Sequence, residues 1–466
     1  MVLSTSSNSS TAFPLPQSTL GLAFNLAALS LVGWLALKLY DVYLGPLSKY
    51  PGPKLWALSP YPRAHSMSQG RESSDIVAFH QKYGPVVRIG PHELSFASGA
   101  DTWKDIYGFR KKGAPQPFKP KQFYGTPLNG IHGLISSDDA GHSRQRKIVS
   151  NSFSDKALKD QEPLLKKWAT LMQKKLFDRA DGKTPHDLVK WYNCTTFDVM
   201  GDLTFSEDLQ MLEGGEYSPW VKTIFQSIKV GTMFRVVRWT SNSGAWFIDN
   251  FIFKTEAARK KQFEHQKYTD DRIDRRLKRE PEHPDLWTKI LEKGEDASEG
   301  GLSIGEHRSN ASLFMIAGTE TTATALSGTT YHLLRNPDTM KALTDEIRSA
   351  YDDFDDITLE SLARQKYLNA VLQEGLRMYP PVPIALPRVT PPEGSTIREQ
   401  FVPPGTRIGV NQLATYRMEE NFKHANEFHP ERWLGDEKFA DDHLDALEPF
   451  SVGPRNCLGK VSSPQS

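Results

Sequence analysis

One loop near the carboxyl end restricts what this chain can fold into more than any other part of it. Residues 450–459 read FSVGPRNCLG and place a single cysteine, Cys457, among residues that suit a buried thiolate: Phe450, Gly453, Arg455 and Gly459. The first glycine permits a tight turn, and the second lets the backbone pass close beneath a flat group. The arginine supplies a cation two residues before the sulfur, and the phenylalanine can keep water from it. An ordinary buried cysteine does not explain this set, so we predict that Cys457 binds a metal.

The pattern F-x-x-G-x-R-x-C-x-G resembles the haem-binding signature of the cytochrome P-450 superfamily, and every fixed place of that signature is filled here. The resemblance implies a mainly α fold, in which a large helical domain carries small β-sheets. It also implies that the cofactor is haem b, iron protoporphyrin IX, with Cys457 as the iron ligand and Arg455 beside a haem propionate.

The charge balance and the cysteine count disfavour several other classes of protein. The 466 residues include 57 Lys plus Arg and 56 Asp plus Glu, and a net charge of +1 provides no field that would attract nucleic acid. Two cysteines in a chain of this length form no disulfide framework. Cys194 has none of the residues that surround Cys457, so we predict that it is a core residue.

Residues 303–335 form a predicted helix whose middle, AGTETT, is poor helix-forming material. Ala317 and Thr321 share a helix face and leave room for a diatomic ligand, while Glu320 offers an acid for proton transfer. Taken alone, the segment is better explained as a threonine-rich packing helix. Together with the cysteine loop downstream, it resembles the superfamily's oxygen-activation motif, A/G-G-x-D/E-T. The resemblance implies that Ala317, Gly318, Glu320 and Thr321 are catalytic.

Two further segments resemble the superfamily's scaffold. Glu374 and Arg377 stand three residues apart on a predicted helix, and Arg432 lies in a Pro-Glu-Arg-Trp segment before the cysteine loop. A surface ion pair is the usual explanation of such spacing and stabilises little. The segments resemble the E-x-x-R helix and the P-E-R-F segment, with Trp433 in place of phenylalanine. The resemblance implies that Glu374, Arg377 and Arg432 form a buried structural network.

Three basic residues are further candidates for binding the propionates. Arg146 and His142 have the spacing of the superfamily's W-x-x-x-R, with histidine replacing tryptophan. Arg388 resembles a strand arginine that also meets a propionate. A surface charge is the alternative for each of them. By analogy of position, substrate is expected near residues 123–131 and 382–386.

The amino-terminal region predicts a membrane anchor. Residues 1–37 contain no Asp, Glu, Lys or Arg, and residues 20–37 are rich in Leu and Ala. Such a helix is long enough to cross the hydrocarbon core, whereas a cleaved signal peptide, the alternative, would want a basic first region. The first basic residues follow the span, which places the body in the cytosol. We therefore predict a lumenal tail (1–19), a transmembrane anchor (20–40), a proline-rich linker (41–54) and a catalytic domain (55–466) in the endoplasmic reticulum membrane.

The resemblance implies a monooxygenase that inserts one oxygen atom of O2 into a small hydrophobic substrate. No flavin or dinucleotide fingerprint occurs in the sequence, so electrons are expected from an NADPH-cytochrome reductase. The details around residues 142–147 and 310–328 resemble fungal members that oxidise secondary metabolites such as terpenoids and polyketides.

Two other hypotheses stay open. The resemblance stops after Lys460, where superfamily members continue into a helix beneath the haem, so the catalytic domain is expected to be incomplete at its carboxyl end. The chain would then be a truncated, non-catalytic haem-binding or misfolded product. A peroxide isomerase of the same fold, which needs no reductase, is the other hypothesis, although Glu320 and Thr321 argue against it.

Hydrophobic periodicity predicts the main elements. Two short strands are expected at residues 85–90 and 93–97, joined by a Gly-Pro turn. Helices are expected at residues 155–179, 219–230, 254–279, 303–335, 338–352 and 359–378. Ser303 and Glu306 predict a capping box at the start of the fourth helix.

Overall fold

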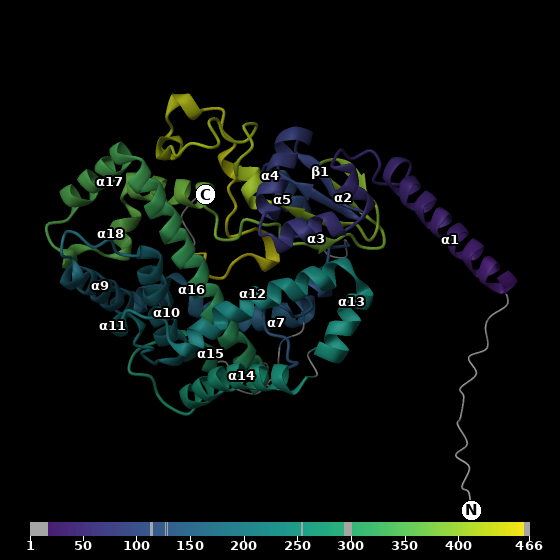
Figure 1. The fold of residues 1–466 in the computed structure, drawn as a ribbon. Helices are drawn as coiled ribbons and strands as arrows, with labels where there is room; N and C mark the ends of the chain where they lie inside the picture. The colour runs from purple at the N-terminus through teal and green to yellow at the C-terminus, as the bar shows by residue number, and fades with distance from the viewer. Residues whose placement is uncertain are drawn as a thin grey trace, which may run out of the picture.

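A computed structural model describes residues 17–111, 115–125, 127, 129–252, 255–292 and 301–460. The body is mainly helical, with the strands gathered in one part of it, and the first helix extends away from this body (Figure 1). This arrangement confirms the predicted fold class of a large helical domain with small sheets.

The helices have the following bounds: α1 Gln17–Tyr43, α2 Lys54–Leu58, α3 Tyr61–Ser68, α4 Glu72–Tyr83, α5 Ala100–Tyr107, α6 Lys121–Tyr124, α7 Asp139–Val149, α8 Asp155–Asp160, α9 Glu162–Arg179, α10 Leu188–Phe205, α11 Met211–Gly214, α12 Pro219–Thr240, α13 Asn242–Phe247, α14 Glu256–Leu277, α15 Leu286–Leu291, α16 Ile304–Arg335, α17 Pro337–Ala350, α18 Leu359–Ala363, α19 Lys366–Met378 and α20 Gln412–Tyr416. The short 3₁₀ turns include η5 Pro430–Leu434 and η8 Gly453–Arg455.

The predicted helices are present, but two of them are divided. The segment 155–179 breaks at Gln161 because Pro163, in the first turn of α9, has no N–H to continue the preceding helix. The segment 359–378 forms α18 and α19. The helix expected at 219–230 runs on to Thr240.

The strands form two sheets. The larger sheet has the order β1-β2-β6-β3, with strands Val86–Gly90, Glu93–Phe96, Arg407–Val410 and Arg388–Val389. The predicted pair β1 and β2 is antiparallel, and β2 lies parallel to β6. Strands β4 (Ser395–Ile397) and β5 (Gln400–Val402) form the second sheet. Arg388, far along the chain, therefore belongs to the same sheet as the amino-terminal strands, with β6 between them.

Helix α16 runs through the middle of the helical part (Figure 1). Its start is fixed by the predicted capping box: the Ser303 hydroxyl accepts from the N–H of Glu306, and the Glu306 carboxylate accepts from the N–H of Ser303. Phe314 and Met315 then join a core that also contains Trp168, Trp287 and the predicted core residue Cys194. The middle of α16 is thus held on one side by the largest core of the molecule.

Helix α1 is apolar, and its residues from Gly21 to Leu37 are exposed. The stretch from Gly21 to Tyr43 is long and hydrophobic enough to cross a membrane, and near its end Val42 is buried. The chain after α1 packs on the body, since Leu47 and Tyr50 belong to the core that also contains β2 and β6 residues. The anchor candidate is therefore joined to the body through a packed segment.

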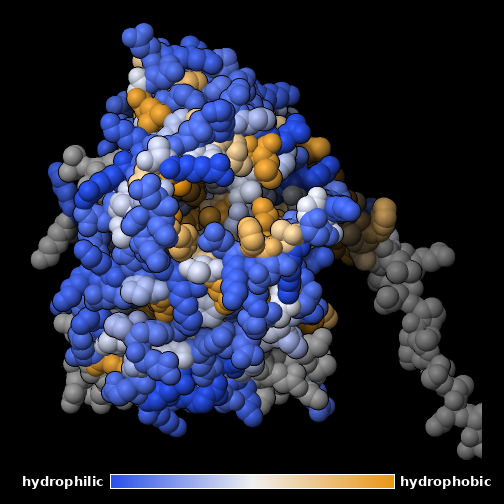
Figure 2. Space-filling model, turned by 90° about the vertical axis from the view of Figure 1, so that its left-hand side faces the viewer, coloured by the Kyte–Doolittle hydropathy of each residue, from blue (hydrophilic) through white to orange (hydrophobic). Residues whose placement is uncertain are grey.

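The body is hollowed on the face that lies to the left in Figure 1. Figure 2 shows this face, with hydrophobic residues gathered inside a hollow near its middle. A hydrophobic hollow in a polar surface is typical of a binding site for an apolar group.

Candidate active site

The cysteine loop is built around a turn that requires glycine. Gly453, in η8, has φ +78°, and a Cβ placed there would lie 2.0 Å from the carbonyl oxygen of Tyr107. The N–H of Cys457 donates to the carbonyl of Phe450 (2.9 Å), which closes the loop. Gly459 makes no such close approach, because a Cβ there would lie an ordinary 3.8 Å from the Cys457 sulfur. The Cys457 side chain is exposed.

Cys457 lines a cavity of about 400 Å³, here called the cysteine cavity. Arg146 of α7 also lines it and donates to the backbone carbonyl of Asn456 (2.7 Å) and to that residue's side-chain oxygen. Leu458, on the other side of the sulfur, packs against the core of α16. The loop is thus tied to α7 on one side and to the α16 core on the other.

A second cavity of about 570 Å³, the cation cavity, shares Arg146, Ser150 and Asn456 with the cysteine cavity. It collects the four predicted propionate-binding residues from separate parts of the chain: His142, Arg146, Arg388 and Arg455. Lys119 and Lys147 line it as well, and among its described lining residues Asp139 is the one acid. The cavity therefore carries a surplus of positive charge.

The electrostatics of the cation cavity favour an anionic partner. Arg455 donates to Asp139 (2.7 Å) and to the carbonyl of Ser137 (2.9 Å), but its buried Nη1 has no partner among the described residues. Burial, followed by repulsion from Arg455 and Arg388, lowers the pKa of Lys119 to about 7. Burial and the neighbouring cations likewise lower the pKa of His142 to about 4. A bound anion would relieve this repulsion.

Arg388 is held firmly in the wall. It is buried, donates to the Tyr124 hydroxyl and to the Pro387 carbonyl (3.1 Å each), and stacks over the Tyr107 ring at 5.0 Å. The sequence alone did not identify Lys119 or Asn456 as members of the site. Lys119 precedes the short helix α6 in a segment that carries no motif, and Asn456 occupies a variable place of the cysteine signature. Tyr124 lies in the stretch 123–131 that was expected near substrate, and the structure places its hydroxyl on Arg388.

The predicted oxygen segment lies in the middle of α16. The Thr321 hydroxyl donates to the Ala317 carbonyl (2.5 Å), and Gly318 lies so close to α10 that a Cβ would be 2.6 Å from the Met200 sulfur. Oε1 of Glu320 is buried without a partner among the described residues, and burial raises the pKa of this carboxyl group.

This segment does not line either of the two cavities just described. It is connected to them one turn earlier in α16, where the Phe314 ring contacts that of Phe153 at 5.6 Å, and Phe153 lines the cysteine cavity. The structure thus brings the predicted cation group together with the cysteine loop, while the oxygen segment is linked to the cysteine cavity through the Phe314–Phe153 contact.

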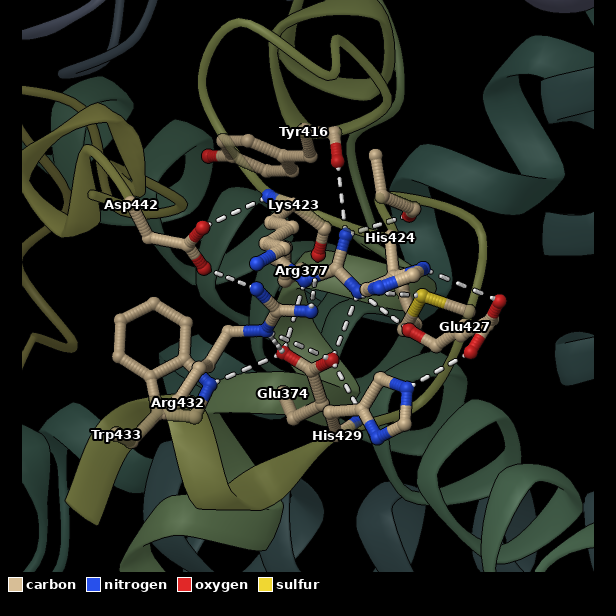
Figure 3. Close-up of polar contacts among 12 residues, drawn as sticks. Glu374, Arg377, Tyr416, Lys423, His424, Glu427, His429, Arg432, Trp433 and Asp442 are labelled. Carbon is tan, nitrogen blue, oxygen red and sulfur yellow. Dashed lines mark hydrogen bonds and ion pairs between the residues drawn. The ribbon is translucent and has the colours of Figure 1, made fainter. Parts of the chain in front are cut away.

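The predicted scaffold residues form a fully buried network (Figure 3). Both oxygens of Glu374 accept hydrogen bonds from Arg377, at 2.7 and 2.8 Å, and Arg432 donates to the same carboxylate at 3.2 Å. Arg377 also donates to the carbonyls of Tyr416 and Ala425, and Arg432 pairs with Asp442. Burial opposes ionisation of Glu374, but the hydrogen bonds and charges of the two arginines hold its pKa below the usual value.

Trp433 takes part in this network in a way that phenylalanine could not. Its indole N–H donates to Glu374 at 3.0 Å, and the N–H of His429 donates to the other oxygen at 2.9 Å. The substitution from the usual P-E-R-F segment therefore adds a hydrogen bond to the buried carboxylate.

Comparison with known proteins supports the same assignment. The model of the cytochrome P450 family matches residues 50–461. The chain belongs to the cytochrome P450 family. It is 50% identical over 425 residues to the cytochrome P450 monooxygenase efuB of Hormonema carpetanum. This alignment covers 90% of the present chain and 83% of the relative.

Other similar proteins are named for their reactions. The averantin hydroxylase of Dothistroma septosporum is 37% identical over 422 residues, covering 90% of this chain and 78% of the relative. The versicolorin B desaturase of Aspergillus parasiticus is 38% identical over 434 residues, covering 92% and 85%. The chain is thus an oxidoreductase of the P450 monooxygenase family, with relatives in fungal secondary metabolism.

The P450 family implies a haem-thiolate cofactor, and the residues present fit such a group. A haem carries two carboxylates, and the cation cavity offers an excess of positive charge with an unpartnered Arg455 nitrogen. The adjoining cysteine cavity presents the exposed sulfur of Cys457. The anion-binding and metal-binding requirements are therefore met side by side.

Proposed function

We propose that this P450 is a haem b monooxygenase in which Cys457 ligates the iron. The observation that carries the proposal is the meeting of two cavities, one lined by Cys457 and the other by four predicted propionate partners. Haem, when bound, supplies the activation of O2 for insertion of one oxygen atom into the substrate.

The residues of this chain have separate tasks in that reaction. His142, Arg146, Arg388 and Arg455 bind and orient the haem carboxylates, with Phe450, Gly453 and Gly459 shaping the loop around the sulfur. On α16, Ala317 leaves room for a small ligand, and Gly318 lets the helix pack closely on Met200 of α10. Glu320, whose pKa is raised by burial, supplies an acid for proton transfer, and Thr321 supplies a hydroxyl beside it in the chain. Glu374, Arg377 and Arg432 hold the scaffold in place.

The substrate we propose is a small hydrophobic secondary metabolite, a terpenoid or polyketide. The hydrophobic hollow in Figure 2 supports an apolar substrate. The names of the averantin and versicolorin B relatives support the fungal secondary-metabolite class.

The cellular setting follows from α1. We propose that residues 20–40 anchor the protein once in the endoplasmic reticulum membrane, with a lumenal tail (1–19), a linker (41–54) and a cytosolic catalytic domain (55–466). The apolar, exposed surface of α1 supports this topology. An NADPH-cytochrome reductase on the same membrane would then supply the electrons.

The test is the absorption spectrum of the purified, reduced protein under carbon monoxide. The proposal predicts a strongly red-shifted Soret band, which is the signature of thiolate ligation. Cys457→Ala should abolish the shift, whereas Cys194→Ala, at the other, buried cysteine, should retain it. Absence of the shifted band from folded wild-type protein would contradict the proposal.

A further inference from the structure

A third cavity lies beside residues 384–387, the segment that immediately precedes Arg388. It has a volume of about 220 Å³ and is lined by Ile384, Ala385 and Pro387, whereas Arg388 lines the cation cavity. The same few residues therefore separate the two cavities. Phe123 lines the third cavity as well, next to Tyr124, which binds Arg388. We call it the Trp239 cavity, after the indole that lines it at the end of α12.

The acids of this cavity are already satisfied. Glu72 accepts from Arg63 at 2.8 Å, and Arg63 also pairs with Glu93. Glu93 accepts in addition from the Trp239 indole N–H at 3.2 Å. One guanidinium thus pairs with both carboxylates.

A second guanidinium, that of Arg235 on α12, lies against the Phe123 ring, with the guanidinium carbon 4.7 Å from the ring centroid. Within the part of the chain that the structure describes, no carboxylate forms an ion pair with it. Burial lowers the pKa of Arg235, and the nearby Tyr124 and Glu72 offset this only in part. A half-buried cation against an aromatic ring is suited to an anionic partner from outside the chain.

Asn411 adds a neutral donor to the same cavity. Its side chain is 1% exposed, and its carbonyl oxygen caps α20 by accepting from the N–H of Ala414 at 2.9 Å. The amide nitrogen is therefore the free end, and it has no acceptor among the described residues. A buried donor without a partner carries a free-energy cost that a bound acceptor removes.

We propose that the Trp239 cavity recognises the carboxylate of a small, otherwise apolar monocarboxylic acid, with Arg235 as the charged partner and the Asn411 amide as the second donor. The proposal rests on the proposed function, since it describes the acid end of a substrate or product whose apolar body extends along the 384–387 segment toward the haem. Arg235 and Asn411 would then determine specificity rather than take part in the chemistry.

The probe pair is 2-naphthoate and its neutral analogue 2-naphthamide, titrated calorimetrically into the full chain purified with α1 in detergent. The wild-type protein should bind the acid at least about tenfold more tightly than the amide, which corresponds to about 1.4 kcal/mol. Arg235→Gln should bring this ratio close to one. Lys229→Gln, which removes an exposed charge from the same helix, should leave it unchanged. Asn411→Asp keeps the oxygen that caps α20 and should weaken naphthoate binding more than naphthamide binding.

An equal affinity of the wild-type protein for the two probes, or a preference that survives Arg235→Gln, would overturn the proposal. The carbon monoxide spectrum is recorded on the same preparations. A preference for naphthoate in protein without the shifted band supports the carboxylate site while contradicting the proposed function. A shifted band without the preference does the reverse.

Discussion

At the scale of single residues, the neighbouring Glu320 and Thr321 side chains of α16 differ in their hydrogen bonding. Glu320 has a buried oxygen without a recorded partner and a raised pKa, whereas the Thr321 hydroxyl is committed to the Ala317 carbonyl. Such a threonine bond loosens the helix ladder locally and leaves the hydroxyl oxygen as an acceptor. The two side chains thus offer an acid without a recorded partner and a hydroxyl that is held by its own helix.

Thr321→Ala should separate haem binding from proton delivery. The red-shifted carbon monoxide band should persist, because Thr321 does not support the cysteine loop. In an assay with reductase, NADPH and oxygen, most of the electrons from NADPH should then form hydrogen peroxide instead of product. The reason is that loss of a proton-transfer group commonly slows the step it serves by a factor of about 10² or more. Peroxide formed per NADPH oxidised measures this. Thr322→Ala, at the exposed neighbour, is the control and should behave as wild type.

At the scale of elements, His80 joins α4 to the sheet. Its Nδ1 lies 2.9 Å from the Gly84 carbonyl and its Nε2 lies 2.8 Å from the Ser95 hydroxyl, a pair of contacts that neutral imidazole satisfies. Burial lowers the pKa of His80 from 6.5 to about 4.

In the unfolded chain His80 becomes protonated as the pH falls below 6.5, whereas in the folded protein it stays neutral down to about pH 4. As the pH is lowered from 6.5 to 4, the free energy of unfolding should therefore decrease. The contribution of His80 to this decrease is up to roughly 3 kcal/mol and becomes constant below pH 4. Denaturant unfolding at pH 7 and at pH 4.5 measures the fall. His80→Gln should lose less stability than wild type between these pH values, and an equal loss would contradict the assignment.

The elements also show what periodicity can predict. Helix α16 was predicted because its capping box and its apolar face are both apparent from residues close together in the sequence. Helix α10 was missed because it is buried on nearly all sides: Asn193, Thr196 and Asp198 are buried along with Phe197, so no polar face alternates with an apolar one. Asp198 is compatible with that position only because it accepts from the N–H groups of Met211 and Leu212, a contact that local sequence does not reveal.

For the candidate site as well, local sequence patterns were predictive and tertiary contacts were not visible in the sequence. Residues inside a strongly patterned motif, such as Cys457 and Glu374, were predicted from the sequence, and for Glu374 the structure shows the predicted buried network. Lys119 and Asn411 were not, since their importance lies in charges and orphaned groups that tertiary packing creates. Trp433 was noted as a substitution, but its hydrogen bond to Glu374 required the fold.

At the scale of the whole molecule, the Glu374 network connects α19, η5 and the loops that lead to the cysteine (Figure 3). Glu374→Gln keeps the shape but leaves two buried guanidinium groups without their shared anion. We expect a loss of about 3–5 kcal/mol in the free energy of unfolding, measured by urea denaturation. Glu427→Gln should cost less than about 1 kcal/mol, because that carboxylate is exposed and Arg377 contacts only its backbone.

The proposed membrane attachment is also tested on the whole molecule. Leu22, Phe24 and Leu29 on α1 are more than half exposed, so their burial has to come from outside the body. Removal of residues 1–40 should make the protein extractable by alkaline carbonate, whereas removal of residues 1–16 should leave it in the membrane pellet. A shortened protein that still resisted carbonate would contradict the role of α1.

The central claim concerns the sulfur of one residue, and X-ray absorption at the iron edge tests it directly. The account predicts one sulfur neighbour of the iron in the purified full chain, and its loss in Cys457→Ala under conditions where the protein remains folded. An iron environment made only of nitrogen and oxygen, or a sulfur that persists after this substitution, would contradict the account.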